Sequence, residues 1–250
     1  MSFPADYRAP TDLLQDRVIL VTGAGDGIGR AVAKACASHG ATVVLLGKTV
    51  AKLESVYDEI EAEGGPQPAI YPMNLEGATP ADHDQLALTL EGQLSRLDGL
   101  VHCAALLPYL SRLKDYEVED WLKVLQVNLN APFMLTQALL PLLQRSPEAS
   151  VVFTGDRVGL EAKPFWGAYG VSKAGVDALA RMWAAELEST TVRVNLVDPG
   201  PTRTALRKRV YPGEDNSSLK LPESLAPLYL WLLGSDSQPV TGESFAWPTC

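Results

Sequence analysis

The sequence predicts an α/β fold in which helices cover both faces of a doubly wound, mostly parallel sheet. Short segments that are apolar throughout alternate along the 250 residues with longer segments of helical periodicity. A strand that is apolar on both sides must bury both of its faces, as the strands of parallel sheets do. A glycine-rich turn also joins the first such strand to the first helix, which is typical of this fold class.

The elements follow one another in a regular order. A strand over 18–21, a turn and a helix over 28–39 form the first unit, which stops at Gly40. The remaining apolar, strand-length segments are 42–46, 69–71, 97–102, 150–154 and 191–197. The remaining segments of helical pattern are 51–63, 81–96, 118–143 and 168–188. The polar segment at about 201–221 interrupts this alternation, and we expect it to be a mobile loop or substrate lid.

Length and composition favour one globular domain over residues 1–250, since 46% of the residues are hydrophobic. The net charge of -9 disfavours binding to nucleic acid or to an anionic membrane. Cys36, Cys103 and Cys250 have neither metal-ligand nor disulfide-framework spacing, which suits a reducing compartment. We find no secretion signal and no bilayer-spanning segment, so we expect a soluble, cytoplasmic protein without a bound metal.

A glycine-rich stretch, Thr22-Gly23-Ala24-Gly25-Asp26-Gly27-Ile28-Gly29, lies between the first strand and the first helix. The first turn of a helix has free backbone N–H groups that bind anions, and glycines let a pyrophosphate approach the backbone closely. Glycine-rich turns also occur merely to make a tight bend. The position between a strand and a helix favours dinucleotide binding.

The spacing Thr-Gly-x-x-x-Gly-Ile-Gly resembles the short-chain dehydrogenase/reductase family. Three later segments fit the same family in its order: 127–131 with Asn128, Tyr169-Gly170-Val171-Ser172-Lys173, and 193–200. The segments 46–48, 133–141, 166–169 and 227–232 further resemble its bacterial YciK-type subgroup. The resemblance implies a three-layer Rossmann fold with a seven-stranded sheet whose last strand lies near 241–247. It also implies an oxidoreductase that interconverts a small-molecule carbonyl and an alcohol, assembled as a homodimer or homotetramer.

The second strand ends in Gly47-Lys48, where an acidic residue would bind the ribose 2′-hydroxyl of NAD. Because Lys48 can pair with a 2′-phosphate, NADP(H) is favoured over NAD(H). Asp26 argues against this preference, and Lys48 also fits a simple solvated turn. Asn74 stands where the family has an aspartate near the adenine, and Cys103-Ala104-Ala105 replaces the usual Asn-Ala-Gly. The implied cofactor site consists of Thr22, Gly23, Gly25, Asp26, Gly27, Ile28, Gly29, Lys48, Asn74, Leu75, Ala104, Tyr169, Lys173, Pro199, Gly200, Thr202 and Thr204.

Tyr169 and Lys173 are four residues apart on a predicted helix, so their side chains share one face. The ammonium of Lys173 should favour the ionised form of the phenol. The resemblance implies that Tyr169 exchanges a proton with the substrate oxygen and that Lys173 holds the nicotinamide ribose. It further implies that Asn128 connects Lys173 to a water relay. An ordinary amphipathic helix is the alternative for the isolated pair.

The family's catalytic serine is replaced by Asp156, thirteen residues before Tyr169. An ionised carboxylate cannot donate to the substrate oxygen, and one lost donor costs about 100- to 1,000-fold in rate. Three roles are open: a protonated acid that donates, a binder of a cationic or hydroxyl-rich substrate, or a partner of Arg157 or another base in a weak or inactive enzyme. The last role leaves a nucleotide-binding protein without efficient turnover as the alternative function. We expect the pocket wall to come from 106–109, Phe165-Trp166 and 202–220.

Overall fold

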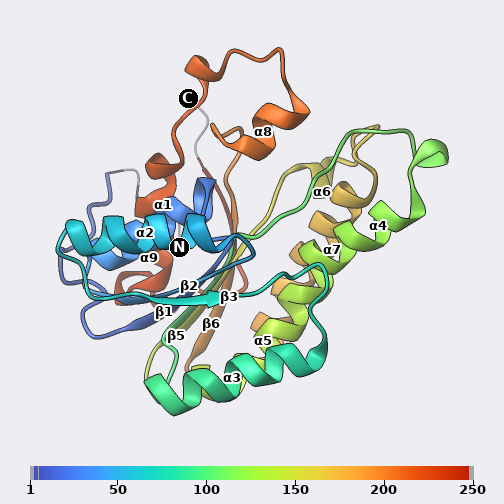
Figure 1. Cartoon of the computed structure of the whole chain (residues 1–250). Helices are drawn as coiled ribbons and strands as arrows, with labels where there is room; N and C mark the ends of the chain where they lie inside the picture. Colours follow the sequence, from blue (N-terminus) through green and yellow to red (C-terminus); the bar gives the residue numbers. More distant parts are fainter. Residues whose placement is uncertain (1–2, 5, 248–250) are drawn as a thin grey trace.

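A seven-stranded, entirely parallel sheet forms the centre of the molecule in the strand order β3-β2-β1-β4-β5-β6-β7. The computed structural model describes residues 3–4 and 6–247, so Cys250 lies outside the described residues. The strands are β1 (Val18–Thr22), β2 (Thr42–Gly47), β3 (Ala69–Pro72), β4 (Gly99–His102), β5 (Ala149–Thr154), β6 (Val192–Asp198) and β7 (Ser244–Ala246). The predicted doubly wound α/β fold is therefore confirmed (Figure 1).

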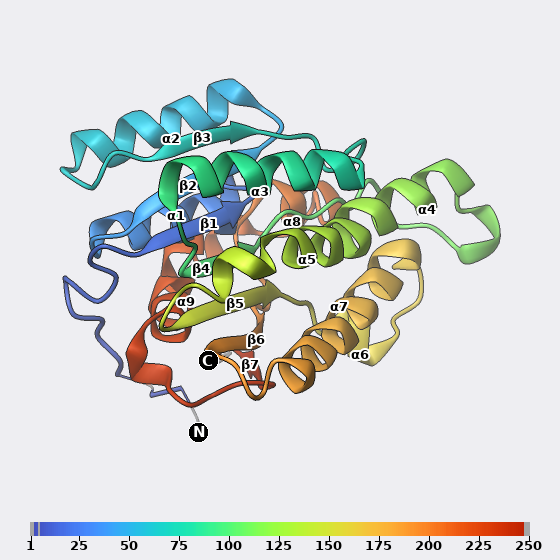
Figure 2. The same cartoon turned by 90° about the horizontal axis from the view of Figure 1, so that it is seen from below.

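Helices cover both faces of the sheet (Figure 2). One face carries α1 (Gly27–Ser38), α2 (Val50–Ala62) and α9 (Ala226–Leu233). The other carries α3 (Pro80–Leu94), α4 (Val118–Leu125), α5 (Ala131–Leu143) and α7 (Gly167–Glu186). Two short helices, α6 (Val158–Glu161) and α8 (Ala205–Val210), follow the carboxyl ends of β5 and β6. No helix among residues 3–4 and 6–247 is long and apolar enough to cross a bilayer.

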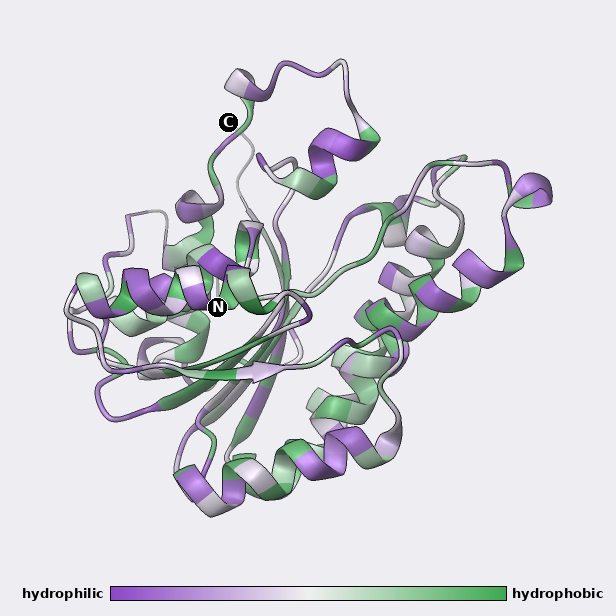
Figure 3. Cartoon of the chain, in the orientation of Figure 1, coloured by the Kyte–Doolittle hydropathy of each residue, from purple (hydrophilic) through white to green (hydrophobic). Residues whose placement is uncertain are grey.

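The core has two layers because most strand residues bury side chains on both faces of the sheet (Figure 3). On β1, Leu20 packs into the cluster under α3, α5 and α7, whereas Ile19 and Val21 pack under α1 and α9. Burial of apolar area is the main stabilising contribution to such a fold, at about 25 cal/mol per Å². This packing fixes the strand ends, and therefore the loops that follow them.

Two segments differ from the sequence-based expectation. The helix expected over 118–143 is interrupted by a π-helical turn, Gln126–Asn130, between α4 and α5. The backbone N–H of Ala131 donates to the carbonyl of Gln126, five residues back, and Pro132 has no N–H to donate to the carbonyl of Asn128. The segment expected as a loop contains α8, whose first turn is capped by Thr204 Oγ1 accepting from the Arg207 N–H at 3.1 Å. A second short helical turn follows at Asn216–Ser218.

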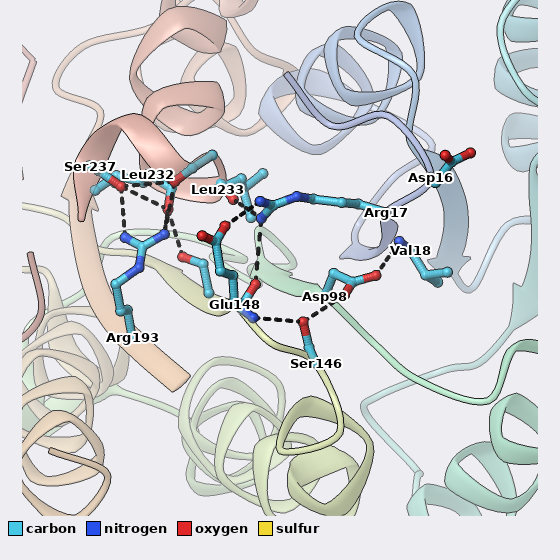
Figure 4. A network of polar contacts seen from close by, with 12 residues as sticks. Asp16, Arg17, Val18, Asp98, Ser146, Glu148, Arg193, Leu232, Leu233 and Ser237 are labelled. Carbon is cyan, nitrogen blue, oxygen red and sulfur yellow. Dashed lines mark hydrogen bonds and ion pairs between the residues drawn. The ribbon is translucent and has the colours of Figure 1, made fainter. Parts of the chain in front are cut away.

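A network of buried polar contacts fastens the amino edge of the sheet (Figure 4). The Asp98 carboxylate accepts from the backbone N–H of Val18 at 2.9 Å and from Ser146 Oγ at 2.6 Å. Arg17 pairs with Glu148, and Arg193 donates to Ser237 and to the carbonyls of Leu232 and Gly234. These contacts satisfy most of the groups and hold this edge together, whereas Nε of Arg193 has no hydrogen-bond partner among the described residues.

Candidate active site

A cavity of about 690 Å³ opens at the carboxyl edge of the sheet. The chain turns from β1 to β2 and β3 on one side and resumes at β4 on the other, so the loops after β1 and β4 separate. Open α/β sheets bind ligands at such a switch point. The loops after β1, β2, β4, β5 and β6 all contribute to the cavity wall.

The structure brings nearly all the predicted site residues together at this cavity. The residues that line it are Gly23, Gly25, Asp26, Gly27, Ile28, Gly29, Lys48, Asn74, Leu75, Ala104, Asp156, Tyr169, Lys173, Pro199, Gly200, Thr202 and Thr204. Thr22 and Asn128 lie behind the wall, with exposed fractions of 1% and 2%. Of the expected pocket wall, Leu106, Leu107 and Trp166 line the cavity, whereas Phe165 is exposed on the surface.

Thr22 ties the two loops at the switch point together. Its hydroxyl accepts hydrogen bonds from the backbone N–H groups of Cys103 at 3.0 Å and Ala104 at 3.1 Å. These contacts join the end of β1 to the end of β4 and satisfy two buried donors. Thr22 thus holds the cavity floor in place without lining the cavity.

The glycine turn is so tight that a side chain at two of its positions would clash with neighbouring backbone. Gly23 has a φ of +66°, and a Cβ on it would lie 3.0 Å from the Ala104 backbone. A Cβ on Gly29 would lie 2.4 Å from the Gly23 carbonyl oxygen. The tight turn therefore exposes its backbone, together with the first turn of α1, to the cavity.

Asp26 is the N-cap of α1 and accepts a hydrogen bond from the Gly27 N–H at 2.8 Å. Its other oxygen pairs with the ammonium of Lys52 at 2.5 Å, and this contact lowers the pKa of the carboxyl. Lys52, which also lines the cavity, was not recognised from the sequence, although it stands in the first turn of the helix after β2. The negative charge of Asp26 is therefore compensated inside the cofactor region.

Tyr169 and Lys173 lie on one face of α7 with their side chains buried beside the end of β5. The Tyr169 hydroxyl donates to Oδ2 of Asp156 at 3.0 Å, and Lys173 Nζ donates to the carbonyl oxygen of Thr154 at 2.7 Å. Nζ of Lys173 lies 5.5 Å from the centre of the Tyr169 ring. All three side chains line the cavity, so they can act on one bound molecule.

Burial, and then the negative charge of Asp156, raise the pKa of the Tyr169 phenol well above 10. The pKa of the phenol therefore shifts in the direction opposite to the one that the ammonium of Lys173 alone would produce. Burial also lowers the pKa of Lys173, while Asp156 opposes that shift. The site therefore holds a protonated phenol beside a carboxylate.

The sequence matches a known protein family over most of its length. A family model described as short chain dehydrogenase matches residues 17–215. The chain belongs to the short-chain dehydrogenase family.

Among the residues that the structure describes, no group of three or more His, Cys, Asp or Glu side chains could hold a metal ion.

Individual short-chain dehydrogenases are similar over nearly their whole length. The uncharacterized oxidoreductase YciK of Escherichia coli strain K12 is 45% identical over 96% of this chain and 94% of its own. A Shigella flexneri short chain dehydrogenase in complex with NADP is 45% identical, with a TM-score of 0.92 over 95% of this chain and 99% of its own. An Escherichia coli CFT073 structure in complex with NADPH is 46% identical, with a TM-score of 0.92 over 95% and 98% of the two chains.

Asp156 does not pair with Arg157, one of the partners that the sequence analysis considered for it. Asp156 Oδ1 accepts from the Val158 N–H at 3.0 Å, and among residues 3–4 and 6–247 no ion pair joins Asp156 to Arg157. Arg157 instead lies 3.6 Å from Glu161.

Asn128 acts through other residues in this short-chain dehydrogenase structure. Its side chain accepts from the Leu106 N–H at 2.7 Å and donates to the Leu106 carbonyl at 3.0 Å. It also donates to Ser172 Oγ at 3.1 Å, and Ser172 donates to the Tyr169 carbonyl at 2.7 Å. The π-helical turn thus connects the loop after β4 to the helix that carries Tyr169.

Proposed function

We propose that the chain is an NADP(H)-dependent oxidoreductase that interconverts a carbonyl and an alcohol on a small-molecule substrate. The observation that carries this proposal is the convergence of Tyr169, Lys173 and the glycine turn on a single cavity. Two relatives of similar sequence and fold were crystallised with NADP or NADPH, which supports the choice of cofactor. Family membership supports the reaction class.

The residues of the cavity fit a nicotinamide dinucleotide. A Cβ at Gly23 or Gly29 would clash with the backbone of Ala104 or Gly23, and a turn this tight, without side chains, supports a close approach of a pyrophosphate to its backbone. Lys48 is exposed at the end of β2, where it would pair with a 2′-phosphate. We infer that Asn74, Leu75 and Ala104 flank the adenine side and that Pro199, Gly200, Thr202 and Thr204 close over the nicotinamide side. When bound, the nicotinamide supplies or accepts the hydride.

The chain's own residues supply the proton. Tyr169 holds a proton at its phenol oxygen and would donate it to the substrate oxygen during carbonyl reduction. Lys173 would orient the ribose from the same face of α7, and its contact with the Thr154 carbonyl holds the ammonium toward the cavity. Leu106, Leu107 and Trp166 form an apolar wall that excludes water from the reacting atoms. Asn128 fixes the loop that carries this wall.

Asp156 stands where a hydrogen-bond donor to the substrate oxygen would raise the turnover rate. Its oxygens already accept two hydrogen bonds, so in its ionised form it supplies no donor to a carbonyl oxygen. This observation favours a second candidate function, a nucleotide-binding protein with weak or no turnover. The two functions share the cofactor and differ in whether Tyr169 controls a measurable rate.

A panel of carbonyls and alcohols with NADPH and NADH tests the proposal on the native chain, Tyr169→Phe and Asp156→Ser. We expect Tyr169→Phe to bind NADPH normally in calorimetry and to lose at least about 100-fold in kcat. An unchanged rate in Tyr169→Phe would refute the mechanism. Activity that arises only in Asp156→Ser would support the nucleotide-binding alternative, and failure to bind either cofactor would contradict both functions.

We also infer that the chain folds as one domain and assembles as a homodimer or homotetramer through α5 and α7. Phe133, Val171 and Met182 are exposed on these helices, with exposed fractions of 41%, 49% and 61%. Apolar side chains gathered on neighbouring helices are typical of an interface between copies. Light scattering on the native chain and Met182→Glu tests the inference, since the introduced charge should weaken the interface and lower the measured mass of the assembly.

We infer further that the segment at about 201–221, which contains α8, acts as the substrate lid.

A further inference from the structure

The carboxylate of Asp156 has acceptor positions left over in the cavity. A carboxylate offers about four lone-pair positions. The Tyr169 hydroxyl and the Val158 N–H occupy two of them, each at 3.0 Å. Asp156 is partly exposed and lines the cavity, so the remaining positions are accessible to the donors of a ligand.

Asp156 also has no counter-ion of its own within residues 3–4 and 6–247. The basic side chains that its charge reaches are each engaged elsewhere. Lys163 binds Glu161 at 2.8 Å, Arg207 binds Glu214 through two contacts of 2.6 and 2.7 Å, and Lys173 donates to the Thr154 carbonyl. Asp198, which lies 3.9 Å from Nε of Arg157, adds a second carboxylate to the same cavity. A neutral ligand that covered Asp156 would therefore bury an unpaired charge, which is costly.

Aromatic rings form the wall beside this carboxylate. The Trp166 ring lies 5.6 Å from the Tyr169 ring and 6.2 Å from the Tyr211 ring, and all three residues line the cavity. Aromatic faces attract cations more strongly where water is excluded. The guanidinium of Arg207 lies 4.0 Å over the Tyr211 ring, so one ring of this wall already contacts a cation.

The distance between the two polar groups sets the shape of the ligand. Only 3.0 Å separates the Tyr169 oxygen from Asp156 Oδ2, so a ligand with its acceptor and its donor on neighbouring carbon atoms can meet both groups. We propose that Asp156 is an ammonium-binding residue that selects amino ketones and amino alcohols whose protonated amine is on the carbon next to the reacting carbon. This inference rests on the proposed oxidoreductase function and names its substrate class.

The reaction balances with groups already described. The carbonyl carbon receives a hydride, with its electron pair, from the reduced nicotinamide, and the oxygen takes the proton of Tyr169. The amino ketone is thereby reduced to the amino alcohol, and the nicotinamide is oxidised. Asp156 transfers no proton. The substrate ammonium takes the place of the Tyr169 hydroxyl on Oδ2, which frees that hydroxyl for the carbonyl oxygen, and its remaining N–H groups lie beside the developing negative charge.

A matched pair of ketones tests the proposal at pH 7: 2-amino-1-phenylethanone in its protonated form, and 1-phenylpropan-1-one, which has a methyl group instead of the ammonium. The proteins are the native chain, Asp156→Asn, Asp156→Ser and the control Glu188→Gln. The control removes the same charge from an exposed side chain outside the cavity. Calorimetry with the two corresponding alcohols, 2-amino-1-phenylethanol and 1-phenylpropan-1-ol, measures binding on the same four proteins without turnover.

We expect the native chain and Glu188→Gln to prefer the amino ketone at least about tenfold in kcat/KM with NADPH. The calorimetric preference for the amino alcohol should be similar, and both Asp156 variants should lose it. A preference that survives in Asp156→Asn and Asp156→Ser, or a native preference for the neutral ketone, overturns the ammonium site. Asp156-dependent binding without turnover supports the ammonium site and refutes the oxidoreductase function. Reduction of both ketones without a preference that depends on Asp156 supports the oxidoreductase function and refutes the ammonium site.

Discussion

The hydroxyl of Tyr169 donates a 3.0 Å hydrogen bond to Oδ2 of Asp156, which stands thirteen residues earlier in the chain. This contact stabilises the protonated phenol, because ionisation would place two negative charges side by side. Burial acts in the same direction, and together they raise the pKa of Tyr169 well above its ordinary value of 10. At neutral pH the phenol is therefore a proton donor and a poor base.

The direction of this pKa shift predicts a strong dependence of alcohol oxidation on pH. Oxidation needs the phenolate, whose population rises about tenfold per pH unit below the pKa. We expect kcat/KM for alcohol oxidation to rise across the whole range from pH 7 to pH 10, while carbonyl reduction shows no loss from deprotonation of Tyr169 there. The measurement is a pair of pH profiles of kcat/KM for the two directions.

Removal of the Asp156 charge should shift the oxidation profile. In Asp156→Asn the phenolate no longer faces a carboxylate, so the pKa of Tyr169 falls and the rise in kcat/KM moves to lower pH. Glu188→Gln is the control, since Glu188 is exposed outside the cavity and should leave the profile in place. An identical profile in Asp156→Asn and the native chain would contradict the role assigned to this carboxylate.

Lys48→Ala should reduce the preference for NADPH over NADH. Lys48 is exposed at the mouth of the cavity, and an exposed ion pair with a 2′-phosphate contributes at most about 1 kcal/mol, so we expect a change of about three- to fivefold in the ratio of the two Kd values. Calorimetric titration with both cofactors measures the ratio. Lys114→Ala removes an exposed lysine outside the cavity and should leave it unchanged. If Lys48→Ala weakens the binding of NADPH and NADH equally, Lys48 attracts the phosphates that both cofactors share and does not recognise the 2′-phosphate.

The fold was predictable from the sequence because strand burial leaves a plain pattern. On β1 and β2, four apolar residues follow one another, at 18–21 and at 43–46, and a strand of this kind is compatible only with two covered faces. The break between α4 and α5 was harder to predict, since the apolar pattern continues through it and only Pro132 indicates the π-helical turn. The helix in the segment after β6 was missed because it has only six residues, too few for a clear apolar periodicity, although Thr204 provides an N-cap signal.

The site was predictable to the extent that its residues occur in ordered motifs. Tyr169, Lys173 and the glycine turn converge on one cavity because the carboxyl ends of parallel strands meet at one edge. What the sequence left open was the partner of Asp156, since a contact thirteen residues away depends on how α7 packs against the end of β5. The compensation of Asp26 by Lys52 is likewise a tertiary contact that no local pattern indicates.

His102 should make the protein sensitive to mild acid. Burial lowers its pKa from 6.5 to about 3, and Nε2 lies 2.9 Å from the Thr136 hydroxyl. Because the folded pKa is the lower one, the stabilisation is complete above pH 6.5 and is lost progressively as pH falls toward 3. From pH 7 to pH 5 the uptake of one proton by the unfolded chain costs about 2 kcal/mol of stability. Urea unfolding at both pH values should show a loss smaller by about this amount in His102→Gln.

The pKa of His83 is also lowered by burial, so some acid sensitivity should remain in His102→Gln. The double variant His83→Gln/His102→Gln should lose less stability between pH 7 and pH 5 than either single variant. A native chain whose stability is the same at the two pH values would contradict the assignment of neutral, buried imidazoles.

Gly29→Ala should damage the cofactor site much more than a glycine replacement elsewhere. The added methyl group would lie 2.4 Å from the Gly23 carbonyl oxygen and 2.7 Å from its carbon, and both belong to the backbone of the turn. The turn must therefore shift, and we expect NADPH affinity to fall at least about tenfold in calorimetry. Gly92→Ala is the matched control, because Gly92 lies in α3 with no atom within 4 Å of its added Cβ. Alanine there should raise the free energy of unfolding by about 0.5–1 kcal/mol and leave NADPH binding unchanged. If both variants bind NADPH like the native chain, the glycine turn does not hold the cofactor.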